Sequence, residues 1–158
     1  MSTTSVRLYR SVRKEDFEQG PIVGEAPAPG VLHPAFEDKP FVQQTPEGPV
    51  QKTRPADTRP FAGDDGVLMV APFKGTSLFD KANVFPAKYW WSFVIPAGTD
   101  VPGSLVVRFT DHNVRYKADH YQIEPKAGIM RLDSYKGALD NLARSALVKF
   151  IAESRGKQ

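Results

Sequence analysis

The chain has 158 residues, of which 41% are hydrophobic and 11% aromatic, enough to bury the core of one ordinary domain. It contains no cysteine, which excludes disulfides, thiolate metal sites and a cysteine nucleophile. There is no apolar run of roughly eighteen residues and no apolar stretch of a secretory signal near Met1. We therefore expect a single soluble domain over residues 1–158, without a membrane segment or a readable export signal.

The formal charge of +3 is unevenly distributed along the chain. Residues 103–158 hold ten Lys/Arg and six Asp/Glu, whereas residues 1–102 hold eleven and twelve. The C-terminal part could therefore attract phosphates or an acidic partner. Charge patterning alone favours the simpler interpretation, a solvated charged face.

The first predicted element is a short strand at residues 6–10. Its alternation places Val6, Leu8 and Arg10 on one face and Tyr9 on the other. Arg10 thus points the same way as apolar neighbours, where a guanidinium could grip a pyrophosphate or a carboxylate at two points. The alternative is that Arg10 ends the strand and reaches water.

Nine of the fourteen prolines lie between Gly20 and Gly63. Proline removes backbone donors and fixes φ, so this stretch cannot be a central strand or a long helix. We expect a long loop at about residues 20–63, ordered or partly mobile, which docks on the core through the apolar segment 31–36.

The remaining elements alternate between strands and turns before one helix. Strands are predicted at residues 67–70, 90–95, 105–109 and 120–124, separated by turns at 64–66, 96–100 and 111–113. An apolar stripe from Tyr135 to Ile151 predicts a C-terminal helix, with Asp133 or Ser134 as its cap and Gly156 at its end. The order indicates an α+β fold with mostly antiparallel pairing.

The segment from Gly75 to Asp80 combines a glycine, the hydroxyls of Thr76 and Ser77, an aromatic ring at Phe79 and a carboxylate. Such a segment could present hydroxyls to a ribose while its backbone approaches the ligand. The alternative is a helix start, with Thr76 or Ser77 as N-cap.

The predicted strand 120–124 places His120, Gln122 and Glu124 in a row on its polar face. Residues of this kind usually face solvent on an antiparallel sheet. If the face lines a cleft instead, Glu124 could stabilise a developing cation and His120 could donate or accept a proton.

Three further patterns bear on the kinds of ligand that the chain could bind. The three histidines, including His33 and His112, lack paired spacing, so we expect no metal site. The aromatic run 89–91 could stack on a base or a nicotinamide, although at least one of its tryptophans is expected in the core. No P-loop and no G-x-G-x-x-G fingerprint is present, which argues against a Rossmann fold.

Several of these segments occur in the same order as in a known family of proteins. The chain resembles the exported toxins of type VI secretion, the Tse family, which have an ADP-ribosyltransferase-like fold. The similarity covers residues 6 to about 147 and is weakest in the proline-rich stretch and at 89–91. The segments that carry it are 8–10, 32–36, 75–80, 93–100, 120–123 and 139–141.

The resemblance implies a split β-sandwich that clasps NAD between two small sheets. Arg10 matches the first-strand arginine that grips NAD, and Thr76 with Ser77 matches the Ser/Thr motif of the middle strand. We add Tyr9 and Phe79 as candidate NAD contacts. Ser77, His120 and Glu124 are the candidate catalytic residues, and the choice between Glu124, in its Gln-x-Glu setting, and His120 stays open.

The resemblance also implies a bacterial toxin delivered by a secretion apparatus into the cytoplasm of a rival cell. A cognate immunity protein would neutralise it, and we predict this partner to be acidic if it covers residues 103–158. The expected reaction is ADP-ribosyl transfer from NAD to an unknown acceptor. The alternatives are NAD hydrolysis, or a non-enzymatic toxin whose basic helix and aromatic residues bind RNA or an acidic protein.

Overall fold

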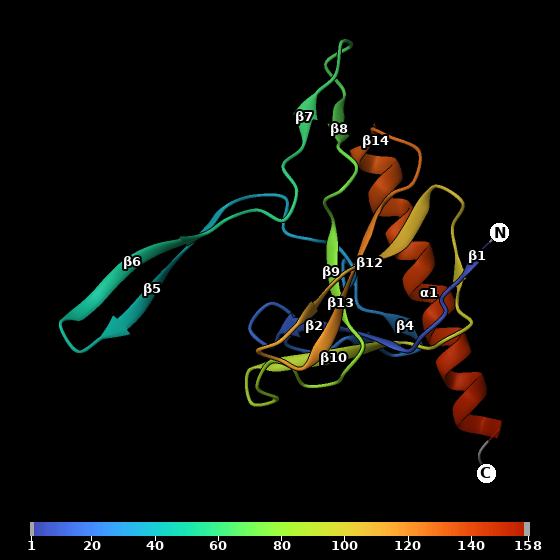
Figure 1. Ribbon diagram of the computed structural model, residues 1–158, viewed down its shortest axis with the longest axis horizontal. Coiled ribbons are helices and arrows are strands. Elements are labelled where there is room, and N and C mark those ends of the chain that lie inside the picture. The colour runs from blue at the N-terminus through green and yellow to red at the C-terminus, as the bar shows by residue number, and fades with distance from the viewer. Residues whose placement is uncertain (1, 157–158) are drawn as a thin grey trace.

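The computed structural model describes residues 2–156, as mixed β-sheets with a single C-terminal helix (Figure 1). The helix is α1 (Leu132–Gly156). The strands are β1 (Ser2–Thr3), β2 (Leu8–Arg13), β3 (Ile22–Val23), β4 (Ala26–Pro27), β5 (Lys39–Thr45), β6 (Gly48–Arg54), β7 (Phe61–Ala62), β8 (Leu68–Val70), β9 (Thr76–Phe79), β10 (Trp90–Ile95), β11 (Asp100–Val101), β12 (Leu105–Asn113), β13 (Ala118–Pro125) and β14 (Met130–Arg131).

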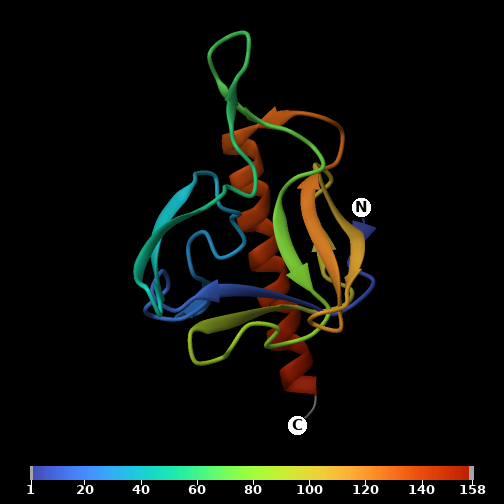
Figure 2. The ribbon, with the colours of Figure 1, turned by 60° about the vertical axis from the view of Figure 1, so that its left-hand side comes forward.

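The main sheet has five antiparallel strands in the order β10-β2-β9-β13-β12. Its middle is weak, because β2 and β9 share a single residue pair, Tyr9 with Phe79. The sheet is thereby divided into a pair, β10-β2, and a triplet, β9-β13-β12. Figure 2 shows these two halves running in different directions in front of α1. This division corresponds to the split sheet that the family resemblance implies.

The helix packs against the sheet through an apolar stripe. Its buried residues are Leu132, Tyr135, Ala138, Leu139, Leu142, Ala143, Ala146 and Leu147. All of these except Leu147 join Leu8, Leu78, Phe93, Ile95 and Ile123 from the main sheet in one core. The helix begins before the predicted caps, so Asp133 lies inside the first turn, where a carboxylate favours the helix dipole.

We expected the proline-rich stretch to be a long loop. Instead, it contains short pairs of antiparallel strands. β3 pairs with β4, and the seven-residue strands β5 and β6 form a hairpin that pairs with no other strand among the described residues. Figure 1 shows this hairpin projecting away from the main sheet. Proline is tolerated there because such strands have no partner on their outer edges.

The structure excludes one local alternative and overturns one further local prediction. The segment at Thr76 is strand β9 and not a helix start, since Thr76 pairs with Ile123 and Ser77 with Gln122 on β13. Residues 111–113, predicted as a turn, continue β12 beside β13. These polar residues are of the types that are common in turns. In the fold, their backbone pairs with β13.

Within the described residues, no helix is long and apolar enough to cross a membrane.

Candidate functional site

Arg10 lies in the middle of β2, in a half-buried position. Its Nη1 donates to the backbone carbonyl of Ser77 at 3.2 Å, and its Nη2 donates to the carbonyl of His33 at 3.0 Å. These bonds use two of the five N–H groups of the guanidinium. The buried Nε has no hydrogen-bond partner among the described residues.

The charge of Arg10 is poorly compensated. No ion pair joins it to a carboxylate in the described part of the chain. Burial lowers the pKa of Arg10, and Asp57 and Tyr135 oppose this shift only in part. A half-buried cation with so little compensation stabilises a fold poorly and is suited to an anionic ligand.

Arg10 lies in the wall of a cavity of about 520 Å³, a usual size for a small-molecule site. Ser77 and Phe79 of β9 also line it, so residues from both halves of the split sheet meet there. Its other charged lining residues are Arg13, Asp16, Glu37, Lys39, Arg54 and Asp57. Within the described residues, the cavity thus combines four cationic and three acidic side chains.

Aromatic rings form part of the same wall. Trp90 stacks on Phe85 with ring centroids 4.7 Å apart, and Phe79 meets Phe85 edge to face at 6.2 Å. Trp91 instead packs against the core and donates from its indole nitrogen to the carbonyl of Phe17. The prediction that one tryptophan packs into the core is therefore confirmed for Trp91, while Trp90 lines the cavity.

Ser77 and Thr76 have different surroundings, as expected for neighbours on a strand. Ser77 lines the cavity, and its hydroxyl makes no hydrogen bond with the described residues. Thr76 is fully buried and donates to the carbonyl of Leu32 at 2.6 Å. Thr76 therefore holds the segment that carries His33 and does not line the cavity.

Tyr9 does not line the cavity either. Its backbone pairs with Phe79, but its hydroxyl accepts a hydrogen bond from Nε of Arg7 at 2.9 Å. Arg7 also lies over the ring of Phe150 on α1. The side chain of Tyr9 thus belongs to a contact between β2 and the helix.

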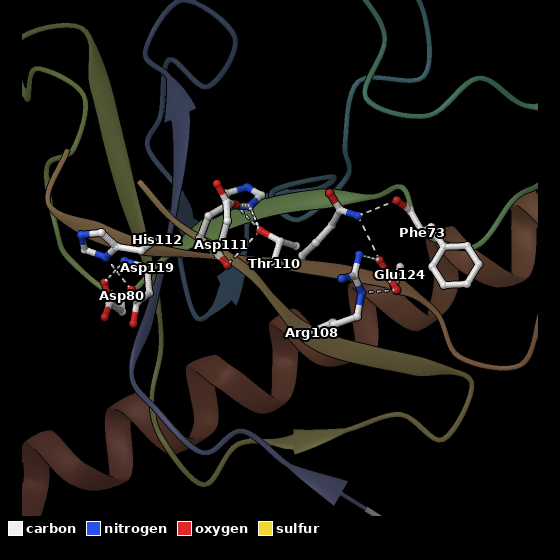
Figure 3. A network of polar contacts seen from close by, with 10 residues as sticks. Phe73, Asp80, Arg108, Thr110, Asp111, His112, Asp119 and Glu124 are labelled. Atoms are coloured by element: carbon white, nitrogen blue, oxygen red, sulfur yellow. Dashed lines mark hydrogen bonds and ion pairs between the residues drawn. The ribbon is translucent and has the colours of Figure 1, made fainter. Parts of the chain in front are cut away.

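Glu124 is buried at the end of β13 and fully engaged (Figure 3). It forms a two-point ion pair with Arg108, Nε–Oε1 2.8 Å and Nη2–Oε2 3.2 Å, and accepts from Nε2 of Gln122 at 2.9 Å. The pair with Glu124 raises the pKa of Arg108. Glu124 does not line the cavity.

His120 lies one strand away from the cavity wall. Its ring packs edge to face on Phe79, with centroids 5.1 Å apart, and its Nδ1 lies 2.5 Å from the hydroxyl of Thr110. Burial lowers the pKa of His120, the charge of Arg108 adds to this shift, and Asp111 opposes it. The neutral form of the His120 imidazole is therefore favoured relative to that of a free histidine.

The sequence did not single out two residues of this site. His33 lines the cavity, and its Nε2 lies 2.8 Å from Oδ1 of Asp140 on α1. Asp57 lines the cavity and accepts from the backbone of Ala35. Both positions depend on contacts with residues more than twenty positions away, which no local pattern indicates.

The predicted site residues thus divide into three groups. Arg10, Ser77 and Phe79 meet at the cavity, and His120 adjoins it through Phe79. Thr76, Tyr9 and Glu124 make contacts elsewhere. Among residues 2–156, no group of three or more histidine or acidic side chains could hold a metal ion.

Comparison with known proteins identifies the family of the chain. The sequence matches the family described as Tse2 ADP-ribosyltransferase toxin over residues 2–150. It is 33% identical over 162 aligned residues to Toxin Tse2 of Pseudomonas aeruginosa, covering 97% of this chain and 95% of that protein. The resemblance noted from the sequence, and the fold class expected from it, are confirmed: the chain belongs to the Tse2 ADP-ribosyltransferase toxin family.

Proposed function

We propose that the protein binds NAD in the cavity at Arg10 and transfers its ADP-ribosyl group to an acceptor. The observation that carries the proposal is the uncompensated guanidinium of Arg10 beside the free hydroxyl of Ser77, where the two halves of the sheet separate. A pyrophosphate supplies the negative charge that Arg10 lacks.

The described residues fit such a ligand in three respects. The remaining N–H groups of Arg10 suit phosphate oxygens, the hydroxyl of Ser77 suits a ribose, and the rings of Phe79 and Trp90 suit a flat heteroaromatic group. The volume of about 520 Å³ lies within the range of ligand pockets.

NAD supplies an ADP-ribosyl group whose bond to nicotinamide breaks with both electrons leaving on nicotinamide, so that positive charge develops on the ribose. In this chain, Arg10 anchors the diphosphate and Ser77 orients the ribose. A proton acceptor is needed for the nucleophile that replaces nicotinamide.

The test is NAD consumption by the purified protein, followed by labelled NAD in a cell lysate. Arg10→Ala and Ser77→Ala should each lower NAD consumption at least about tenfold, as expected for the loss of a positioning group. Arg7→Ala, at the exposed position just before β2, and the exposed Ser104→Ala are the matched controls. Full activity of both cavity variants would reject the site.

Transfer and hydrolysis are separated by the product. A labelled macromolecule in the lysate supports transfer, whereas free ADP-ribose alone means that water is the acceptor. NAD left intact under both conditions would contradict the proposed activity.

We also propose that the toxin acts in the cytoplasm of a recipient cell and has a cognate immunity protein. Homology to Toxin Tse2 supports this biology. The excess of basic residues in 103–158 favours an acidic partner. A neutralising partner that leaves this part of the chain uncovered would reject the charge argument.

A further inference from the structure

The pairing of β12 with β13 is interrupted at one residue. Phe109 pairs with Tyr121 and Asp111 pairs with His120, so Thr110 is an extra residue without an opposite partner. This is a β-bulge, a feature that redirects a side chain and is frequent beside active sites. Here it brings the hydroxyl of Thr110 to the imidazole of His120.

The hydroxyl of Thr110 carries one hydrogen but lies close to two oxygen atoms that could accept it. It lies 2.7 Å from Oδ1 of Asp111 and 3.1 Å from the carbonyl oxygen of His120, and both of these atoms can only accept. Its third contact is Nδ1 of His120, at 2.5 Å. Because the hydroxyl has one hydrogen and gives it to an acceptor oxygen, Nδ1 must supply the hydrogen for the third contact.

We infer that Thr110 is a positioning residue that keeps neutral His120 in the tautomer with its hydrogen on Nδ1, and thereby makes Nε2 the basic nitrogen beside the cavity. The catalytic role that we give to Nε2 rests on the proposed NAD chemistry. The assignment of the tautomer rests only on the contacts of Thr110 and His120. Figure 3 shows Thr110 beside Asp111, and Arg108 with Glu124 as a separate group of contacts further along the strands.

The surroundings of His120 support this assignment. Oδ1 of Asp111 lies 3.7 Å from Nδ1, on the side where a hydrogen is favourable. No hydrogen bond joins Nε2 to the described residues. Phe79, which lines the cavity, packs edge to face on the ring and holds its orientation.

The same arrangement explains which group accepts the proton. Glu124 is committed to Arg108 and Gln122, whereas Nε2 of His120 is free. The nucleophile attacks C1′ of the ribose, the bond to nicotinamide breaks, and the proton of the nucleophile passes to Nε2. The imidazolium formed then donates from Nδ1 to Thr110, with the carboxylate of Asp111 nearby.

The inference is tested by NMR of the imidazole nitrogens in uniformly ¹⁵N-labelled protein, above the pH at which His120 is charged. The signals of His120 are identified by their loss in His120→Gln. In the unmodified protein, the hydrogen-bearing nitrogen should be Nδ1. A hydrogen on Nε2 would overturn the inference.

Thr110→Val and Thr110→Ala remove the hydroxyl, and Thr110→Ser keeps it. We expect both tautomers or a hydrogen on Nε2 in the first two variants, and the original tautomer in Thr110→Ser. An unchanged tautomer in folded Thr110→Val and Thr110→Ala would overturn the role of Thr110. The exposed Thr3→Val is a control for the loss of a hydroxyl elsewhere.

Kinetics separate this inference from the proposed function. If the protein consumes NAD, Thr110→Val should lower kcat about tenfold or more with little change in KM, and Thr110→Ser should recover most of it. An unchanged kcat in Thr110→Val would contradict the positioning role. If the unmodified protein leaves NAD intact, the proposed function fails, while the NMR result still decides the tautomer.

Discussion

The guanidinium of Arg108 holds the buried carboxylate of Glu124 at two points, with Nε–Oε1 and Nη2–Oε2 distances of 2.8 Å and 3.2 Å. The two partners are unequally exposed, since the side chain of Arg108 is 41% exposed and that of Glu124 only 3%. Removing either partner should therefore have different consequences for stability.

Arg108→Met should lower the free energy of unfolding more than Glu124→Gln. The first change leaves a buried carboxylate with only the amide of Gln122, whereas the second leaves a cation that can turn to water. Urea denaturation of both variants and of the double variant measures this difference. Equal losses would mean that the carboxylate is not effectively buried.

A pH prediction follows from His120, whose folded-state pKa lies below the ordinary value of 6.5 because burial disfavours the charged ring. Between these two pKa values the unfolded chain binds more protons, so His120 makes the free energy of unfolding rise with pH. The stability that neutral His120 provides is therefore lost as the pH falls from the ordinary pKa of histidine to the lower pKa of His120 in the folded protein. The difference between the unmodified protein and His120→Gln, followed from pH 5 to 8, isolates it. A difference that changes in the opposite direction would contradict the burial argument.

Some of the strands and the helix follow from local patterns. The predicted strand at residues 90–95 has the bounds of β10, and the apolar stripe from Tyr135 predicted most of α1. The β5–β6 hairpin was missed because its prolines argue against strands, yet Pro40 and Pro49 lie in strands that pair only with each other.

The site could be predicted only in part. Alternation placed Arg10 on an apolar face, and the family resemblance joined it to Ser77. The ion pair of Glu124 and the bulge at Thr110 depend on the register between β12 and β13, which a sequence pattern does not specify. Glu124 therefore appeared as accessible as His120, although its carboxylate is occupied.

Two glycines offer a matched test of packing. A Cβ on Gly75 would lie 1.9 Å from the carbonyl oxygen of Ile123 and 2.6 Å from the hydroxyl of Tyr135, whereas a Cβ on Gly137 would meet nothing within 4 Å. Gly75→Ala should thus destabilise the protein by about 1–3 kcal/mol or more by separating β9 from β13. Gly137→Ala, in the helix, should stabilise it by roughly 0.5–1 kcal/mol. Thermal unfolding of both variants checks the contrast, and similar effects would contradict the close approach at Gly75.

Thr76 distinguishes a structural contact from a binding contact. Its hydroxyl donates to Leu32 at 2.6 Å in the interior, next to the segment whose His33 carbonyl accepts from Arg10. Thr76→Val keeps the shape but leaves the carbonyl of Leu32 without its donor, which should cost about 1–3 kcal/mol of stability. Thr76→Ser should retain both stability and activity.

Activity should fall in Thr76→Val as a consequence of the same change, because Arg10 loses a well-placed acceptor at His33. Chemical denaturation and NAD consumption are therefore expected to change together in this variant. In Ser77→Ala, by contrast, activity should fall while stability stays nearly constant, since the hydroxyl of Ser77 bonds to no described residue. A Thr76→Val protein that keeps full stability but binds NAD weakly would instead assign the Thr76 hydroxyl to the ligand.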